Sequence, residues 1–224
     1  MSDMHLLSVN VGRGIPVPRA GKPIETGIYK LPVREGVRIT SSGLVGDEIH
    51  DTENHGGVDQ AVYVYGAPDY EWWSEELGRD LTPGTFGENL TISGLCSAEA
   101  LIGDRLRNGI VVLEVTAPRV PCVTLATRMK DPAFLKRFRR AERLGLYCRV
   151  IREGPVRAGD KVFYERYRGD TVSATEMFRD FFDPDVGEQT IQRYLDAPIA
   201  IRDRVAKEER LRELLARKVG VERG

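Results

Sequence analysis

The sequence predicts a mainly β protein with some α structure, in which a closed or partly closed β-barrel is followed by a small domain of three helices. Three observations predict this fold class. From Leu6 to about Tyr167, short apolar runs alternate with turns rich in Gly, Pro and Asp. Two helical segments interrupt that region, and after Tyr167 the pattern becomes helical. We therefore divide the chain into a barrel domain, residues 1–168, and a three-helix domain, residues 169–224.

The barrel is predicted from short strands, each an apolar run bounded by turn residues. The predicted strands are residues 6–11, 37–39, 61–65, 89–92, 104–106, 109–115, 147–151 and 161–167. Gly-Asp pairs at residues 103–104 and 159–160 precede two of them, which is a common way to begin a hairpin strand.

Helices are predicted from their start and stop signals. Residues 68–77 have a proline near the start and Gly78 after the end, while residues 131–138 have Asp131 as N-cap and Pro132 in the first turn. The predicted C-terminal helices are residues 172–182, 187–195 and 199–218. Because so short a three-helix domain buries little apolar surface alone, we expect it to pack on the barrel, on another subunit or on a partner.

Composition and charge exclude several classes of protein. The 224 residues carry a formal net charge of −1, so we expect neither nucleic acid nor a membrane as partner. No apolar run approaches the length of a membrane span and no signal peptide is evident, so we expect a cytoplasmic location. The three cysteines, Cys96, Cys122 and Cys148, lack CxxC spacing, which argues against a disulfide framework and a four-cysteine zinc site.

Residues 118–122, Pro-Arg-Val-Pro-Cys, carry the strongest local signal for chemistry. They follow the apolar run 109–116 and indicate a strand that ends in a rigid turn displaying a thiol, since each proline fixes φ and lacks an N–H donor. Arg119 would favour the thiolate of Cys122, which is the form that acts as a nucleophile or as a soft metal ligand. The alternative is a structural or incidental cysteine at a strand end.

Two glycine-containing turns supply candidate binding residues. His55, Gly56 and Gly57 directly precede a strand, where paired glycines let backbone N–H groups converge on an anion and the histidine adds a donor or a charge. Asn89, in the turn 86–89, offers a donor and an acceptor edge suited to the amide-like face of a heterocycle. The alternatives are a tight turn with a surface histidine and an asparagine that only orders its own loop.

Other active-site patterns are weak or missing in the sequence. His50 and His55, with Asp51 and Glu53, match no standard closed zinc site. The sequence has no Gly-x-Ser-x-Gly elbow of a hydrolase, no Gly-x-Gly-x-x-Gly fingerprint and no P-loop.

Six motifs occur in one order along the barrel region. They are residues 43–47, 55–63, 86–90, 102–104, 118–122, and Gly145 followed by Arg149-Val150. This order resembles the MOSC domain, the C-terminal domain type of molybdenum cofactor sulfurases, and most closely its bacterial YiiM-like subgroup. The resemblance covers roughly residues 6–167, and the three C-terminal helices resemble the small domain that often follows in that subgroup. Cys148 departs from the pattern, where a tyrosine or other large residue often precedes the Arg-Val pair.

The resemblance implies a mainly β barrel that binds molybdenum cofactor, a pyranopterin phosphate whose dithiolene holds molybdenum. The single protein thiolate ligand of the family falls on Cys122, which makes it both the metal ligand and the catalytic residue. Residues implied to bind the rest of the cofactor are His55, Gly56, Gly57 and Asn89, with Arg119 and Arg149 as anion partners. Asp47 is expected at most to order its loop or to contact a cofactor amine.

The resemblance also implies an activity. YiiM-like members are similar to the mitochondrial amidoxime-reducing component, so we expect two-electron reduction of the N–O bond in small N-hydroxylated compounds, a detoxification reaction. The electrons would come from a partner reductase, and the chain would act as a monomer or a homodimer.

Two other functions are weighed against this activity. The protein would be a molybdenum cofactor carrier without turnover of its own, or a sulfur carrier that uses a Cys122 persulfide. Pyridoxal phosphate is considered unlikely, because no barrel lysine occurs in a recognisable Schiff-base setting. Those lysines include Lys22, Lys30, Lys130, Lys136 and Lys161.

Overall fold

The fold is a closed β-barrel, as the sequence predicts. The computed structural model describes residues 4–18, 23–50, 55–183 and 186–221. In this part of the chain seven strands pair in the order β13-β9-β10-β11-β7-β8-β1, and β1 pairs with β13 to close the ring. The barrel strands are β1 (Met4–Val11), β7 (Val62–Gly66), β8 (Leu90–Ile92), β9 (Arg105–Asn108), β10 (Val111–Pro118), β11 (Leu146–Arg152) and β13 (Lys161–Glu165). Within the ring, β7 and β8 run parallel and the other neighbours are antiparallel.

The sequence prediction finds every barrel strand but misses most of the short strands outside the ring. The predicted strand 37–39 is β5 (Val37–Thr40), which pairs with β6 and β12 in a separate sheet. The strands without a sequence prediction are β2 (Ile15–Val17), β3 (Ile24–Thr26), β4 (Leu31–Pro32), β6 (Gly43–Leu44) and β12 (Gly154–Val156). These two- and three-residue strands are too short to show an alternating pattern, so their pairing partners define them.

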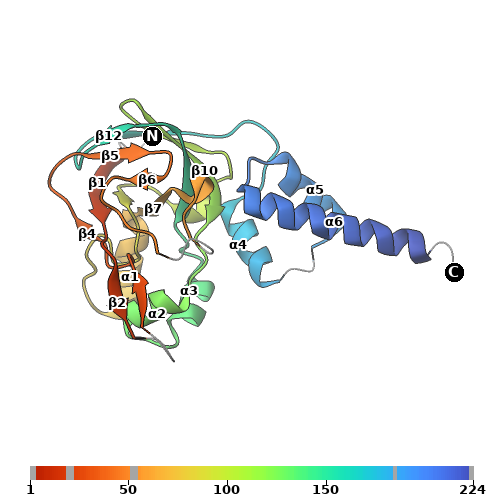
Figure 1. The fold of residues 1–224 in the computed structure, drawn as a ribbon, viewed down its shortest axis with the longest axis horizontal. Coiled ribbons are helices and arrows are strands. Elements are labelled where there is room, and N and C mark those ends of the chain that lie inside the picture. Colours follow the sequence, from red (N-terminus) through yellow and green to blue (C-terminus); the bar gives the residue numbers. More distant parts are fainter. Residues whose placement is uncertain (1–3, 19–22, 51–54, 184–185, 222–224) are drawn as a thin grey trace.

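Three helices lie at one end of the barrel (Figure 1): α1 (Ala67–Leu77), α2 (Val123–Met129) and α3 (Phe134–Ala141). Trp73 of α1 stacks among Phe86, Phe134 and Phe138, all fully buried. Helix α3 begins three residues later than predicted, because the Asp131 carboxylate accepts the N–H of Ala133 in a turn before the helix. Helix α2 was not predicted, since its sequence begins with β-branched residues that favour strands.

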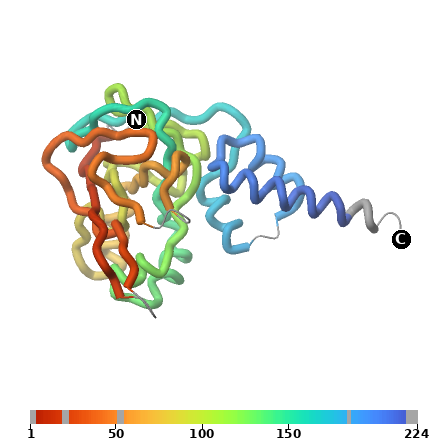
Figure 2. Tube along the Cα trace, in the orientation of Figure 1, coloured from red at the N-terminus to blue at the C-terminus, as the bar shows by residue number. Residues whose placement is uncertain are grey.

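The three C-terminal helices are α4 (Ala174–Phe182), α5 (Glu188–Asp196) and α6 (Ile201–Val221). They lie beside the barrel, and α6 points away from it towards the C-terminus (Figures 1 and 2). Ser173 caps α4 by accepting the N–H of Glu176, and Phe178 packs against Phe138 of α3 with ring centroids 6.3 Å apart. Of the three expected packing partners for these helices, the structure shows the barrel.

No helix in the described ranges is both long enough and apolar enough to cross a membrane.

Candidate functional site

A cavity of about 570 Å³ is lined by residues of the barrel and of the segments around it. Segments far apart in the sequence form its walls: the β2–β3 hairpin, the residues before β7, the turn before β8, and the start of α2. Five of the predicted site residues line it, namely His55, Gly56, Asn89, Arg119 and Cys122. Gly57 and Arg149 do not line it.

Cys122 occupies the junction between β10 and α2. Its backbone is extended, and its carbonyl accepts the N–H groups of Leu125 and Ala126, so Cys122 is the N-cap residue of the helix. The side chain is partly buried and faces the cavity. The turn displaying a thiol, predicted from residues 118–122, is therefore present and leads into a helix.

The Cys122 sulfur is surrounded by hydrogen-bond donors. Arg119 Nη2 lies 3.3 Å from Sγ, and His55 also bonds to the thiol. Burial alone would raise the thiol pKa, but the His55 hydrogen bond and the Arg119 charge outweigh burial and lower the pKa to about 5 from 9.0. Nδ1 of His55 lies 3.2 Å from the Tyr147 hydroxyl. Cys122 is therefore a thiolate at neutral pH, held by a chain of polar contacts.

The guanidinium of Arg119 is fixed in place on several sides. It donates to the carbonyl of Val120, and its central carbon lies 5.9 Å and 5.7 Å from the ring centroids of Tyr63 and Tyr147. The residue is 5% exposed. Its positive charge is therefore directed at the Cys122 thiolate, as the sequence predicts, and its second expected role as an anion partner of the cofactor stays a prediction.

The glycine pair before β7 adopts conformations that favour glycine. Gly56 has φ +77° and Gly57 has φ +80° with ψ 171°, a region that is essentially closed to other residues. The next turn, η1 (Val58–Gln60), follows directly, and Gln60 lines the cavity. Gln60 Oε1 is buried with no hydrogen-bond partner in the described part of the chain. Sequence reasoning missed Gln60, because a single glutamine carries no motif.

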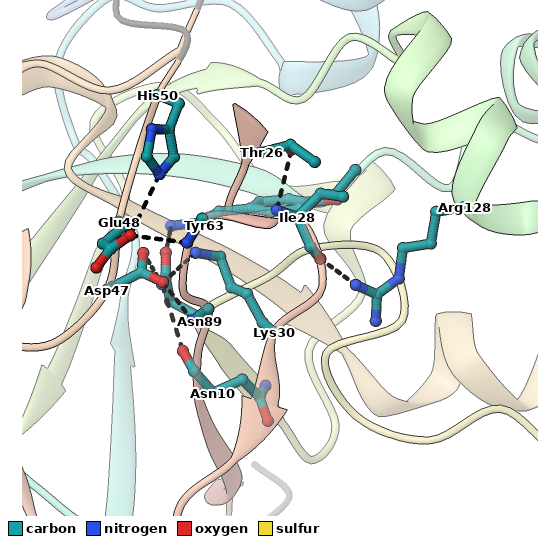
Figure 3. A network of polar contacts seen from close by, with 12 residues as sticks. Asn10, Thr26, Ile28, Lys30, Asp47, Glu48, His50, Tyr63, Asn89 and Arg128 are labelled. Carbon is teal, nitrogen blue, oxygen red and sulfur yellow. Dashed lines mark hydrogen bonds and ion pairs between the residues drawn. The ribbon is translucent and has the colours of Figure 1, made fainter. Parts of the chain in front are cut away.

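The side chain of Asn89 is hydrogen-bonded to other groups of the protein. Its Oδ1 accepts the N–H of Tyr63 at 3.1 Å, and its Nδ2 donates to Asp47 Oδ2 at 2.8 Å (Figure 3). Both edges that were expected to meet a heterocycle are thus paired with protein atoms. Asp47 also accepts the N–H of Gly12 and forms a buried ion pair with Lys30, so it orders this loop, as expected.

Lys30, one of the barrel lysines that show no Schiff-base setting in the sequence, is buried and paired in the structure. It lines the cavity, and burial lowers its pKa although Asp47 opposes the effect. The ion pair with Asp47 uses its ammonium group, which leaves it poorly placed as a free amine. Lys22 lies outside the described residues.

The structure corrects the role predicted for Arg149, which was expected to be an anion partner of the cofactor. Its Nη2 donates to the carbonyls of Pro198 and Ile199 at 3.1 Å and 2.8 Å, and its Nε forms an ion pair with Asp59 at 3.1 Å. The guanidinium therefore holds the segment that leads into α6. It does not line the cavity, and its bonds go to Asp59 and to the segment between α5 and α6.

The remaining candidates do not form a second site. Cys148 is fully buried, and burial raises its pKa, so it is an inert thiol of the core. Cys96 is exposed. The described residues hold no group of three or more side chains suited to a metal ion. Asp51 and Glu53, part of the discounted zinc site, lie outside the described residues.

Two glutamates and a histidine form a polar cluster among the residues that line the cavity. His50 Nε2 lies 3.2 Å from Glu48 Oε2, and its Nδ1 lies 3.4 Å from Glu25 on the β2–β3 hairpin (Figure 3 shows the Glu48 contact). The N–H of Gly14 donates to Glu48 at 2.7 Å and, with His50, lowers the Glu48 pKa. This cluster ties the hairpin to the residues after β6.

Known proteins resemble this chain in sequence and fold. The family model described as MOSC domain matches residues 51–163. The chain is 40% identical over 154 residues to YflK of Bacillus subtilis (strain 168), covering 69% of this chain and 70% of that protein. It is 36% identical over 161 residues to a protein of Gibberella moniliformis (strain M3125 / FGSC 7600) named Reductase, covering 70% of this chain and 28% of that protein. The crystal structure of YiiM from Geobacillus stearothermophilus matches with a TM-score of 0.76 and 25% identity, covering 93% of this chain and 99% of that one.

Proposed function

Because the chain belongs to the MOSC domain family, we propose that it binds molybdenum cofactor in the cavity and reduces small N-hydroxylated compounds. The electrons would come from a partner reductase. The observation that carries the proposal is a thiolate, Cys122, held at a pKa of about 5 and facing a cavity of about 570 Å³.

The residues of the cavity fit such a cofactor. A thiolate is a soft ligand, which suits a thiophilic metal better than an oxygen donor would. Gln60 Oε1 is a buried acceptor without a donor in the described part of the chain, which is costly unless a ligand supplies one. The N–H groups of a pterin are donors of the required kind. The chemistry of the donor set therefore agrees with the family.

The chain's own residues have distinct tasks in this proposal. Cys122 would bind the metal, while His55 and Arg119 stabilise its anionic form before the metal arrives. Gln60 would accept from the pterin, and Gly56, which lines the cavity, offers a backbone N–H for the phosphate. When bound, the cofactor supplies a metal that exchanges two electrons with the substrate.

The name of the fungal relative supports a reductase. That protein is named Reductase, and this chain corresponds to only 28% of its length. That name agrees with a redox activity, whose electrons we propose to come from a partner reductase. We expect this protein to need such a donor for turnover.

The test is metal analysis followed by an activity assay. Protein purified from a host that makes molybdenum cofactor is analysed by mass spectrometry, and then reduced methyl viologen and an N-hydroxylated amidine are added. We expect molybdenum in a ratio near one per chain and formation of the amidine. Molybdenum without reduction would identify a carrier. Labile sulfur on Cys122 without molybdenum would identify a persulfide carrier and contradict the proposal.

A further inference from the structure

One of the contacts between the C-terminal helices and the barrel is made by the carboxylate of Asp59. Its Oδ2 accepts the N–H of Ile201, the first residue of α6, at 2.7 Å. Its Oδ1 lies 3.1 Å from Nε of Arg149, whose Nη2 donates to the two carbonyls just before α6. A carboxylate at the start of a helix is stabilised by unpaired N–H groups and by the helix dipole. Asp59 therefore anchors α6 on the barrel.

Asp59 also lies in the middle of the turn that forms one wall of the cavity. It belongs to η1, with Gln60 after it and the pair Gly56-Gly57 before it. The hydroxyl of Thr116 on β10 donates to the carbonyl of Asp59 at 2.5 Å, so the backbone is fixed from the barrel side as well. The side chains of His55 and Gln60 face the cavity, whereas the side chain of Asp59 faces the helices.

The glycines make this turn dependent on an external anchor. Gly56 and Gly57 both have positive φ, where glycine restricts the backbone least. Inside the turn, the N–H of Gln60 bonds to the carbonyl of Gly57 at 3.1 Å. A turn that begins with two glycines gains much of its order from contacts at its far end, and here these are the Asp59 contacts.

We propose that Asp59 is a positioning residue, which couples the docking of α6 to the placement of His55 and Gln60 at the cavity. The C-terminal helices are then part of the ligand site although they supply no residue that lines it. This inference rests on the proposed function only in identifying the ligand as molybdenum cofactor.

The experiment compares Asp59→Ala with a matched variant in the full-length protein. Arg179 on α4 also joins the C-terminal helices to the rest of the protein, through two bonds of 2.6 Å and 2.5 Å to Glu142, the residue that ends α3. Arg179→Ala therefore removes a similar ion pair and leaves the Asp59 contacts in place. Asp59→Asn is the conservative variant, because its amide oxygen still accepts the N–H of Ile201.

The first readout is amide hydrogen exchange in cofactor-free protein, followed for residues 55–60. We expect exchange at the Gln60 N–H to rise about tenfold in Asp59→Ala, with a smaller change in Asp59→Asn and none in Arg179→Ala. The second readout is the molybdenum content of protein from a cofactor-competent host. We expect about a fivefold lower content in Asp59→Ala and recovery in Asp59→Asn.

Unchanged exchange at residues 55–60 in a folded Asp59→Ala protein overturns the inference. Equal loss of molybdenum in Asp59→Ala and Arg179→Ala also overturns it, because helix docking in general would then be responsible. If Asp59→Ala does not fold, Arg149→Lys removes the paired carbonyl contacts and is judged by the same two readouts. Faster exchange in a series that never contains molybdenum supports the coupling and refutes the proposed function alone.

Discussion

Tyr147 and Arg149 are two residues apart on β11, yet they serve different regions of the molecule. Tyr147 lines the cavity and contacts His55, whereas Arg149 is covered by the segment that leads into α6. Cys148 between them points to the opposite face, into the core. Tyr147 thus faces the ligand cavity, and Arg149 faces the segment that docks the C-terminal helices. The groups that each side chain contacts determine its role.

Arg119 and Arg149, both expected to be anion partners of the cofactor, also differ in what surrounds them. Arg119 is close to a thiolate and inside the cavity, while Arg149 is close to the carboxylate of Asp59 and to backbone carbonyls. Both supply a positive charge, Arg119 directly after β10 and Arg149 within β11. Residues 198–201 are about fifty positions away from Arg149 along the chain. They bond to Arg149 and to its partner Asp59, so Arg149 holds the C-terminal helices on the barrel.

The largest difference is expected between the variants that remove the cavity thiol, Cys122, and the core thiol, Cys148. Cys122→Ser should abolish molybdenum binding in a folded protein, because a hydroxyl is a poor ligand for a soft site. Cys148→Ala should keep the metal, since Cys148 is buried in the core and its loss should lower stability by about 1 kcal/mol. Molybdenum content by mass spectrometry and melting temperature measure the two outcomes. Equal molybdenum in Cys122→Ser and wild type would refute the ligand role.

The next effect sharpens the contrast between the arginines. Arg119→Gln removes a positive charge and a hydrogen bond from the Cys122 sulfur, so the thiol pKa should rise from about 5 towards its ordinary value of 9.0, by about one unit or more. Arg149→Gln should shift the pKa less and lower the melting temperature more. The pH dependence of Cys122 alkylation, in cofactor-free protein that carries Cys96→Ser, gives both pKa values. A larger shift in Arg149→Gln would reverse the assignment of the two arginines.

The glycine turn should respond to a Cβ through backbone strain. Gly57 has φ +80°, and an added Cβ would meet no atom within 4 Å, so the cost of Gly57→Val is conformational, about 1–3 kcal/mol. We expect lower cofactor occupancy in Gly57→Val than in the surface control Arg217→Ala, with circular dichroism confirming the fold. Full occupancy in a folded Gly57→Val protein would mean that the turn does not bind the cofactor phosphate.

Short-range patterns were sufficient for most of the fold. Apolar runs and turn residues located every barrel strand, and Gly78 marked a helix end where predicted. Contacts between distant segments were not predictable in this way. The Cys122 motif is readable in one segment, but the pairing of Asn89 with Asp47 and the burial of Lys30 depend on loops that are far apart in the sequence.

The smallest effect is expected at Tyr147, the residue of β11 that lines the cavity. Tyr147→Phe removes a hydroxyl that lies 3.2 Å from His55 Nδ1 and keeps the ring that packs near Arg119. A single hydrogen bond of this kind contributes about 0.5–1.5 kcal/mol, so the pKa of Cys122 should rise by about one unit at most. The alkylation profile measures the shift, with Tyr164→Phe as a control far from the cavity lining. A shift in Tyr147→Phe as large as that in Arg119→Gln would show that orientation of His55, more than the Arg119 charge, keeps Cys122 ionised.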